Sequence, residues 1–420
     1  MTKPVEPRSG VVKVSPSKTP VWKVSPANGQ YYINSVAVSA EGDRVIGGTF
    51  YSTYGATASS RRADMAGFLG APSADSDNGT FGTYAYNASG QLLWKNEFSG
   101  WRGVYWVAVS ADGSKAASGG LMAQSPQAGF VRAFDGATGA VLLDQATQQR
   151  VNQVALSVDG AWLVSAAETL ILFQFHAPSG AYVQAAVFTP TPSNVSTSPN
   201  AVVSAGISAD GSTIVFSDYL GNVGVLTNTA GVLAVRRQWK MAVSFCHMVA
   251  LTTDGKFFAA GGAAGCFYLN DTARFITDGK PTYTYDTGLA DPVYGVAVAE
   301  NGRVFAGVVN SGADAGFVYV AEIVDFAAGL QVKFPTARNP NSASLHLDTG
   351  LLAVADGHPD ATPGHFYLYE GITDTGLPII APGVAWEYTT GNMSWPVKIS
   401  ANGQVVVGGS DDSNVYYFTV

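Results

Sequence analysis

The sequence predicts an all-β fold built from eight copies of one four-stranded unit, and three observations support this prediction. One short pattern returns along nearly the whole chain at similar intervals. Each copy of the pattern contains a turn of the Asp-Gly type between two β-rich runs. The composition agrees, because the 420 residues include 48 glycines and only 13% of the chain is charged, about half the share of an average soluble protein.

The repeated pattern is clearest in Ser35–Gly48 (SVAVSAEGDRVIGG) and Trp106–Gly120 (WVAVSADGSKAASGG). The turn joins the two β runs, and its glycine supplies the positive φ of a tight hairpin. Two further β runs follow in each copy, as in Gly82–Phe98. The remaining copies begin at Gln153, Ser204, Met248, Gly295, Ala343 and Pro396.

The spacing of the turn glycines predicts a β-propeller. Successive glycines are 44 to 53 residues apart, except for a first step of 71. Four short antiparallel strands in about 40 to 50 residues are typical of a propeller blade, and about 4 to 8 blades form a ring. We therefore expect an eight-bladed β-propeller with four antiparallel strands per blade. The turn glycines are Gly42, Gly113, Gly160, Gly211, Gly255, Gly302, Gly350 and Gly403.

A Trp-Lys pair near the N-terminus predicts how the ring closes. Trp22 resembles Trp94 and Trp239, which both lie in the fourth β run of a copy. The last copy offers only three runs before Val420. We expect residues 19–25 to supply the missing outer strand of the eighth blade, because this closure removes an open sheet edge.

The domain organisation follows from this closure. Residues 1–18 are expected to form an N-terminal tail, and residues 19–420 a single propeller. The long first step places an inserted loop at 51–79 in blade one, which is polar and rich in Gly, Ala and Ser. Long loops in compact folds are often functional. Arg61, Arg62 and Asp64 in this loop are candidates for binding an anion. A solvated loop without this function is an equal alternative.

Two segments carry a resemblance to known propeller families. Asn402–Phe418 (NGQVVVGGSDDSNVYYF) resembles a WD-repeat blade, whereas Tyr84–Lys95 (YAYNASGQLLWK) and Arg132–Leu143 (RAFDGATGAVLL) resemble the quinoprotein, or pyrroloquinoline-quinone-like, repeat. The resemblance implies the fold and no particular chemistry. Quinoprotein dehydrogenases place adjacent cysteines over their cofactor, but Cys246 and Cys266 are far apart in the sequence, so no cofactor is expected.

The two cysteines are expected to be free thiols. Cys246 opens the innermost strand of the fifth blade, and Cys266 opens its third strand. Two strand spacings amount to about 9.5 Å. A disulfide needs Cα atoms closer than about 7 Å.

Charge and hydropathy exclude several classes of partner. The net charge of -8, without any long basic run, argues against a nucleic-acid or anionic-membrane partner. Apolar stretches such as Thr169–Phe175 are far shorter than the roughly 20 residues of a membrane helix. We expect a monomer without membrane insertion. The low charge favours an exported, extracytoplasmic bacterial protein, although residues 1–10 contain no secretory signal.

A candidate binding site lies where the inner strands begin. In a propeller these strand ends face the loops around the central channel, and rigid blades that present variable loops commonly carry function. The aligned copies place polar and aromatic residues there, the combination that small-molecule pockets use. The alternative is that these side chains only pack and cap the channel. The candidate ligand-binding residues are Asn34, Trp101, Arg102, Tyr105, Trp106, Asn152, His247, Tyr294 and Trp395.

The sequence favours binding over catalysis. It contains no Gly-x-Ser-x-Gly, His-Glu-x-x-His or glycine-rich phosphate loop. The first hypothesis is a non-catalytic propeller that binds a small molecule, glycan or protein at the channel mouth. The alternative is a lyase, hydrolase or oxidoreductase with His247 as general base and Tyr105, Tyr294 and Arg102 polarising the substrate.

A metal site is the weakest candidate. The segment DGHPDATPGH groups two carboxylates and two imidazoles, which are donors for divalent ions. Their spacing matches no strong template, so surface turn chemistry is the favoured interpretation. The four residues are Asp356, His358, Asp360 and His365.

Overall fold

The computed structural model describes the chain in segments. These are residues 16–26, 31–50, 80–99, 101–122, 128–191, 200–241, 246–262, 264–289, 293–310, 315–324, 327–358, 361–372 and 382–420. Within them the fold is all-β, with 32 strands and one short helix, α2 (Thr272–Asp278), which connects the third and fourth strands of one sheet. No helix among the described residues is long and apolar enough to span a membrane.

Most of the sheets contain four antiparallel strands in chain order, and each is named here by its innermost strand. The β10 unit contains β10 (Gln153–Leu156), β11 (Trp162–Ala166), β12 (Leu170–His176) and β13 (Ala181–Phe188). The β14 unit contains β14 (Val202–Ile207), β15 (Thr213–Asp218), β16 (Asn222–Thr229) and β17 (Val232–Lys240). The β18 unit contains β18 (Cys246–Leu251), β19 (Phe257–Gly262), β20 (Cys266–Asp271) and β21 (Tyr283–Asp286).

The later part of the chain forms three further four-stranded sheets. The β22 unit contains β22 (Val293–Val298), β23 (Val304–Asn310), β24 (Gly316–Val324) and β25 (Ala327–Thr336). The β26 unit contains β26 (Pro340–His346), β27 (Leu351–His358), β28 (Ala361–Glu370) and β29 (Gly383–Thr390). The β30 unit contains β30 (Ser394–Ile399), β31 (Val405–Ser410), β32 (Val415–Thr419) and β1 (Trp22–Val24).

The remaining strands form one eight-stranded sheet with two four-stranded parts. The pair Phe50 and Gly103 connects the second strand of one part to the first strand of the other. The β2 unit contains β2 (Tyr32–Val38), β3 (Arg44–Phe50), β4 (Thr80–Asn87) and β5 (Leu92–Ser99). The β6 unit contains β6 (Trp101–Val109), β7 (Lys115–Met122), β8 (Gly129–Asp135) and β9 (Val141–Thr147).

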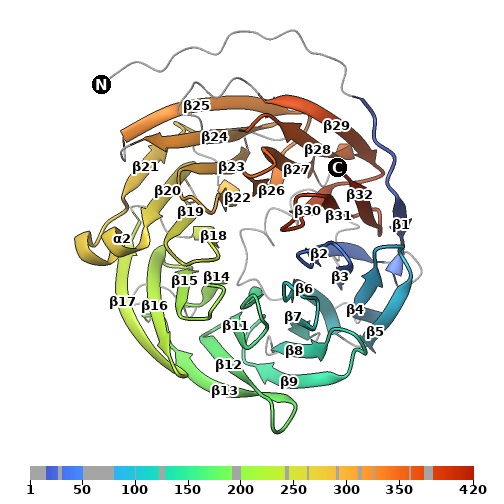
Figure 1. The fold of residues 1–420 in the computed structure, drawn as a ribbon, viewed down its shortest axis with the longest axis vertical. Coiled ribbons are helices and arrows are strands. Elements are labelled where there is room, and N and C mark those ends of the chain that lie inside the picture. The colour runs from blue at the N-terminus through green and yellow to red at the C-terminus, as the bar shows by residue number, and fades with distance from the viewer. Residues whose placement is uncertain are drawn as a thin grey trace.

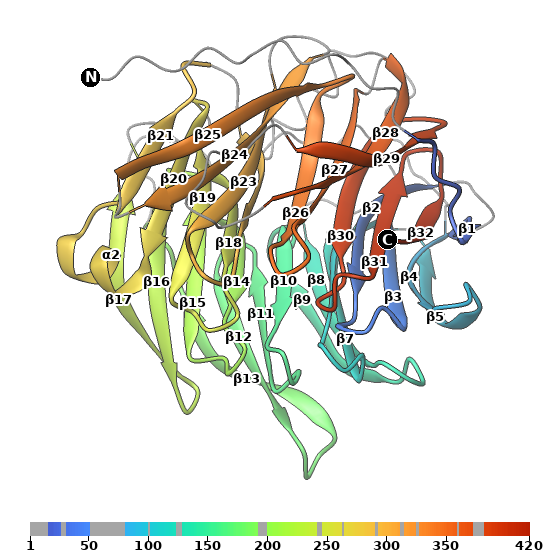
Figure 2. The same cartoon turned by 45° about the horizontal axis from the view of Figure 1, so that its top comes forward.

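The sheets are arranged around a common axis, with the innermost strands nearest the centre (Figure 1). Each innermost strand contacts the next one along the chain, and β30 contacts β2. The tilted view shows the same strands running roughly along the axis (Figure 2). Buried side chains fill the space between neighbouring sheets, as in the cluster of Ile33, Val45 and Val407 between the β2 and β30 units. The all-β prediction is confirmed. The inserted loop at 51–79 lies outside the described residues.

Short backbone hydrogen bonds also join neighbouring units at the opposite end from the candidate site. The turn between the first and second strands of one unit donates to the same turn of the next. Examples are Ala40 N to Ala111 O at 2.8 Å and Ala111 N to Val158 O at 2.9 Å. In the β30 unit, Asn402 N donates to Ala40 O at 3.1 Å, so this unit is joined to the β2 unit.

The N-terminal strand β1 lies at the outer edge of the β30 unit. Its Trp22 pairs with Tyr417 of β32 in an antiparallel register. The Trp22 indole stacks on the Tyr417 ring at 5.0 Å, and its Nε1 donates to Ala88 O at 2.9 Å, in the β2 unit. Trp22 therefore contacts two units at once.

Two of the recurring tryptophans, Trp22 and Trp94, share one packing role. Trp94 Nε1 donates to Gly136 O at 2.9 Å, just as Trp22 donates to the turn of the following unit. Each indole covers a turn glycine with positive φ, and a Cβ at Gly90 or Gly139 would lie 2.8 or 2.7 Å from the covering indole. Only glycine leaves room for this contact.

Trp386 of β29 lacks this partner turn. The unit after it is the β30 unit, whose outer strand β1 comes from the N-terminal side, so no turn leads from β32 to β1. The Trp386 side chain is buried, and its indole nitrogen has no hydrogen-bond partner in the described part of the chain. The turn carbonyls that accept from Trp22 and Trp94 therefore have no described counterpart at Trp386.

The cysteines occupy the predicted strands. Cys246 opens β18 and Cys266 opens β20, with β19 between them. The Cys266 thiol is free, and burial raises its pKa. The side chain of Cys246 lies outside the described residues.

Candidate functional site

β-bulges interrupt the inner strands near their first residues. A bulged residue is left out of the hydrogen-bonded ladder and is turned away from the regular side-chain pattern. Tyr105, His247, Tyr294 and Trp395 all fall in such bulges, as does Asn34. These candidate positions therefore share a β-bulge. The sequence alignment gave the positions but did not predict the bulge.

One inner strand departs from the predicted alignment. In β26 the bulged residue is Asn341, because the register shifts between Pro340 and Ser342. The spacing from Gly42 back to Asn34, when it is applied to Gly350, selects Ser342 instead. Gly350 lies one position later in its turn than the other glycines do, so this count is wrong by one residue. Asn341 was missed for this reason.

Three asparagines near the strand starts link neighbouring units. Asn34 Nδ2 donates to Tyr105 O at 2.8 Å, and Asn152 Nδ2 donates to Val202 O at 2.8 Å. Asn341 Nδ2 donates to Ser394 O at 2.9 Å. Their amides hold adjacent inner strands together. Asn34 and Asn152 therefore stabilise the strands that carry the site.

A guanidinium and two tyrosines gather at one part of this rim. Arg150 lies over the Tyr105 ring, 4.2 Å from its centre, and Arg150 Nε donates to Asn152 Oδ1 at 3.0 Å. Tyr219, which follows β15, completes the group, and burial raises the pKa of its phenol. Such a cation–π contact is attractive and holds the guanidinium over the ring. The sequence prediction missed Arg150 and Tyr219, although Arg150 stands only two residues before Asn152.

A second aromatic group comes from strands on either side of β26. The rings of Tyr294 on β22 and Trp395 on β30 meet edge to face at 5.9 Å. Two predicted residues that are 101 positions apart in the sequence are thus in contact. We call Tyr105, Arg150, Tyr219, Tyr294 and Trp395 the axial rim.

The other predicted site residues are placed differently. Trp106 packs against the core cluster of Val131, Val154 and Phe173, so it has a packing role. The side chains of Trp101, Arg102 and His247 lie outside the described residues. The proposed catalytic set therefore stays a prediction.

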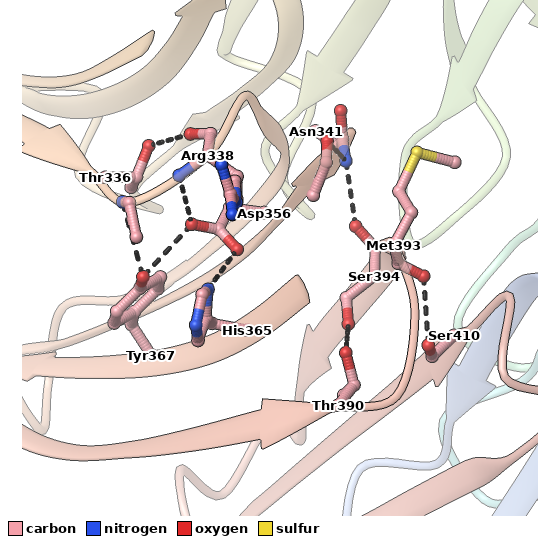
Figure 3. A network of polar contacts seen from close by, with 12 residues as sticks. Thr336, Arg338, Asn341, Asp356, His365, Tyr367, Thr390, Met393, Ser394 and Ser410 are labelled. Carbon is pink, nitrogen blue, oxygen red and sulfur yellow. Dashed lines mark hydrogen bonds and ion pairs between the residues drawn. The ribbon is translucent and has the colours of Figure 1, made fainter. Parts of the chain in front are cut away.

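Asp356 is the centre of a buried polar network (Figure 3). Its Oδ1 is 2.8 Å from His365 Nδ1, and its Oδ2 accepts from Tyr367 Oη at 3.0 Å and from Arg338 N at 2.9 Å. Burial, followed by the Asp356 charge, raises the pKa of Tyr367. Among the described residues no three His, Cys, Asp or Glu side chains could share a metal ion, and Asp360 lies outside this part of the chain.

Acidic groups at the ends of second strands recur in the fold. Glu168 accepts from Gln148 N and Gln149 N, each at 3.0 Å. Asp218 accepts from Asn200 Nδ2 at 2.8 Å. In each case the carboxylate holds the segment that leads into an inner strand. Asp356 has the same role towards Arg338, whose backbone N–H donates to it.

Lys398 on β30 is the one Lys, Arg, Asp or Glu among the described side chains of the inner strands. Val397 and Ile399 pack into one core cluster, so Lys398 leaves the opposite side of the strand. Its side chain is exposed to solvent, yet desolvation by the surrounding protein lowers its pKa from the ordinary value of 10.5.

Replacing this lysine is expected to stabilise the protein in a pH-dependent way. A pKa that is lower in the folded state means that the charged form destabilises the fold, fully below the folded pKa and not at all above 10.5. Lys398→Met should therefore unfold at higher urea than the wild type at pH 7, with a smaller advantage at pH 10. Lys280→Met, at an exposed site, is the control. An advantage that is equal at both pH values would contradict the assignment.

Comparison with known proteins supports the fold. No protein-family model matches the chain, and no curated protein matches it. The crystal structure of Sqt1 from Chaetomium thermophilum is similar, with a TM-score of 0.68 and 14% identity over 96% of this chain and 99% of Sqt1. The chain has a β-propeller fold. The WD-repeat-like and quinoprotein-like character of the repeats stays a prediction.

A second similar structure contains a partner. It shows Chaetomium thermophilum Sqt1 bound to the N-terminus of the ribosomal protein L10. Its TM-score is 0.66, with 13% identity over 94% of this chain and 98% of Sqt1. At this identity the likeness concerns the fold alone.

Proposed function

We propose that this chain is a non-catalytic, eight-bladed β-propeller that binds a segment of a partner protein at the axial rim. The observation that carries the proposal is the gathering of four aromatic rings and one guanidinium at one end of the inner strands. Tyr, Trp and Arg are the residues most enriched at the energetic centres of protein interfaces. The complex of Sqt1 with the N-terminus of L10 supports a chain terminus as the type of partner.

The blade count and the closure belong to the same proposal. We count the eight-stranded sheet as two blades, because a single pair, Phe50 with Gly103, is the ladder contact between its two parts. The β30 unit is then the eighth blade, closed by β1. The domain is proposed to cover residues 19–420, with residues 1–18 as a tail and 51–79 as an inserted loop.

Selection of peptides tests the proposal. Random dodecapeptides displayed on phage are selected on the immobilised protein, and affinities of synthetic copies are measured by fluorescence polarisation. Arg150→Gln and Trp395→Ala are each expected to weaken binding about tenfold or more, as loss of a central interface residue does. Lys280→Met should bind like the wild type. Circular dichroism checks that each variant is folded.

Two results would count against the proposal. If no peptide is selected, the protein does not bind short segments. If both rim variants bind like the wild type, the segment binds elsewhere, and the axial rim serves packing alone.

A further inference from the structure

The segment that contains β1 has a near copy ten residues earlier in the chain. Residues 11–16 read VVKVSP, and residues 21–26 read VWKVSP. The two copies differ at one position, where the second has Trp22 and the first has Val12. The second copy contains β1, whereas residues 11–15 lie outside the described residues. A sheet edge that accepts the second copy therefore has a nearly identical segment available in the same chain.

Backbone pairing holds the second copy to β32. Val21 N donates to Tyr417 O at 2.8 Å. The antiparallel register continues to Val24, which pairs with Val415. Ladder bonds of this kind use main-chain groups and do not require particular side chains. The first copy offers the same groups, because in both copies the only proline is the last residue.

The side chains of the second copy alternate between packed and exposed. Trp22 and Val24 are partly buried and pack against the core cluster between the β2 and β30 units. The exposed residues are Val21, Lys23 and Ser25. The first copy has valines at both packed positions and identical residues at the three exposed positions. It therefore keeps this pattern and lacks only the indole.

The first copy ends close to the edge of β32. Glu387 N on β29 donates to Pro16 O at 3.1 Å, and Lys18 N donates to Glu387 O at 3.0 Å. The last residue of the first copy is thus held at the outer edge of the β26 unit, next to the β30 unit. A move of ten residues would lengthen the connection from β1 to β2, and the entropy of loop closure rises only slowly with length.

We propose that the outer edge of β32 is a docking site for either copy, and that residues 11–16 form the outer strand of the β30 unit when β1 leaves it. In the wild type β1 holds this edge, because only its indole stacks on Tyr417 and donates to Ala88 O. The first copy then protects an open edge from pairing with a foreign strand. This inference concerns the closing strand and does not depend on peptide binding at the axial rim.

Removal of residues 17–26 tests the inference, because it places the first copy directly before Ala27, where the second copy stood. We expect this variant to fold, with a urea midpoint below that of the wild type because the indole is lost. In this variant Val14→Asp should lower the midpoint by about 1 M or more, since it puts a charge at a packed position. In the full chain the same substitution should have no effect. Lys13→Gln, at an exposed position of the pattern, is the matched control and should be neutral in both chains.

Cross-linking in the full chain is the second measurement. Cysteines introduced by Val14→Cys and Val415→Cys face each other when residue 14 takes the place of Val24. Directly paired residues of antiparallel strands have Cα atoms about 4.5–5.5 Å apart, which suits a disulfide. Oxidation and peptide mass spectrometry should show about tenfold more of this disulfide when Trp22→Ala and Val24→Ala weaken the second copy.

The outcomes decide the inference in each case. It is overturned if Val14→Asp has the same effect with and without residues 17–26, or if the 14–415 disulfide does not increase. If the deletion variant does not fold but the disulfide increases, the first copy docks on β32 in the full chain and the inference stands. A failed peptide selection would end the proposed function and leave these results unchanged.

Discussion

Removal of residues 1–25 is expected to destabilise the protein by about 3–5 kcal/mol or more, the range for loss of a packed tryptophan together with its strand. The deletion removes the pairing of β1 with β32 and the stacking of Trp22 on Tyr417. It also exposes β32 as a sheet edge. Urea unfolding followed by circular dichroism measures the loss.

Single substitutions separate the packing of Trp22 from the rest of the segment. Trp22→Ala should account for a large part of the loss, because the indole contacts both the β30 and β2 units. Val21→Ala is the matched control, since the Val21 side chain is exposed. A synthetic peptide of residues 16–26, added to the truncated protein, should restore stability as its concentration rises. A truncated protein as stable as the wild type would refute closure by β1.

Asp356→Ala is expected to cost about 3–5 kcal/mol, as removal of one partner from a buried ionic or hydrogen-bonded group does. The substitution leaves His365 Nδ1, Tyr367 Oη and Arg338 N without their acceptor in a buried place. Unfolding in urea gives the loss directly. If a bound metal were the reason for the cluster, the wild type would instead lose stability on addition of a chelator, and we expect no such loss.

Glu322→Leu is the contrasting control, because Glu322 is also a fully buried carboxylate. Among the described residues neither of its oxygens has a hydrogen-bond partner, and its ion pair with the half-exposed Arg303 spans 3.5 Å. Replacement of such a weakly satisfied charge by an apolar side chain is expected to change stability by less than about 1 kcal/mol or to raise it. Similar losses for Asp356→Ala and Glu322→Leu would mean that burial, rather than the hydrogen bonds, decides the effect.

The sequence predicts the fold well because the repeat imposes it. The Asp-Gly turns, the β runs and the outer-strand tryptophans each reflect a local requirement, so their periodicity locates the strands and the pairing of β1. The same logic fails where a copy departs from the pattern. In β26 the turn glycine is displaced by one residue, and the count then selects Ser342 instead of Asn341.

The site is harder to predict because its residues come together from separate units. Tyr294 and Trp395 were selected individually, but their contact depends on the curvature of the ring. Arg150 and Tyr219 belong to connecting segments, where the repeat gives no alignment.

Hydrogen exchange with and without a selected peptide tests the central claim, that the axial rim binds a protein segment. We expect slower exchange at the starts of the inner strands, in residues 103–106, 150–153, 293–295 and 394–397, and unchanged exchange in the turns at 110–115 and 400–405. Protection at those turns or along the outer strands, with the rim unaffected, would contradict the account.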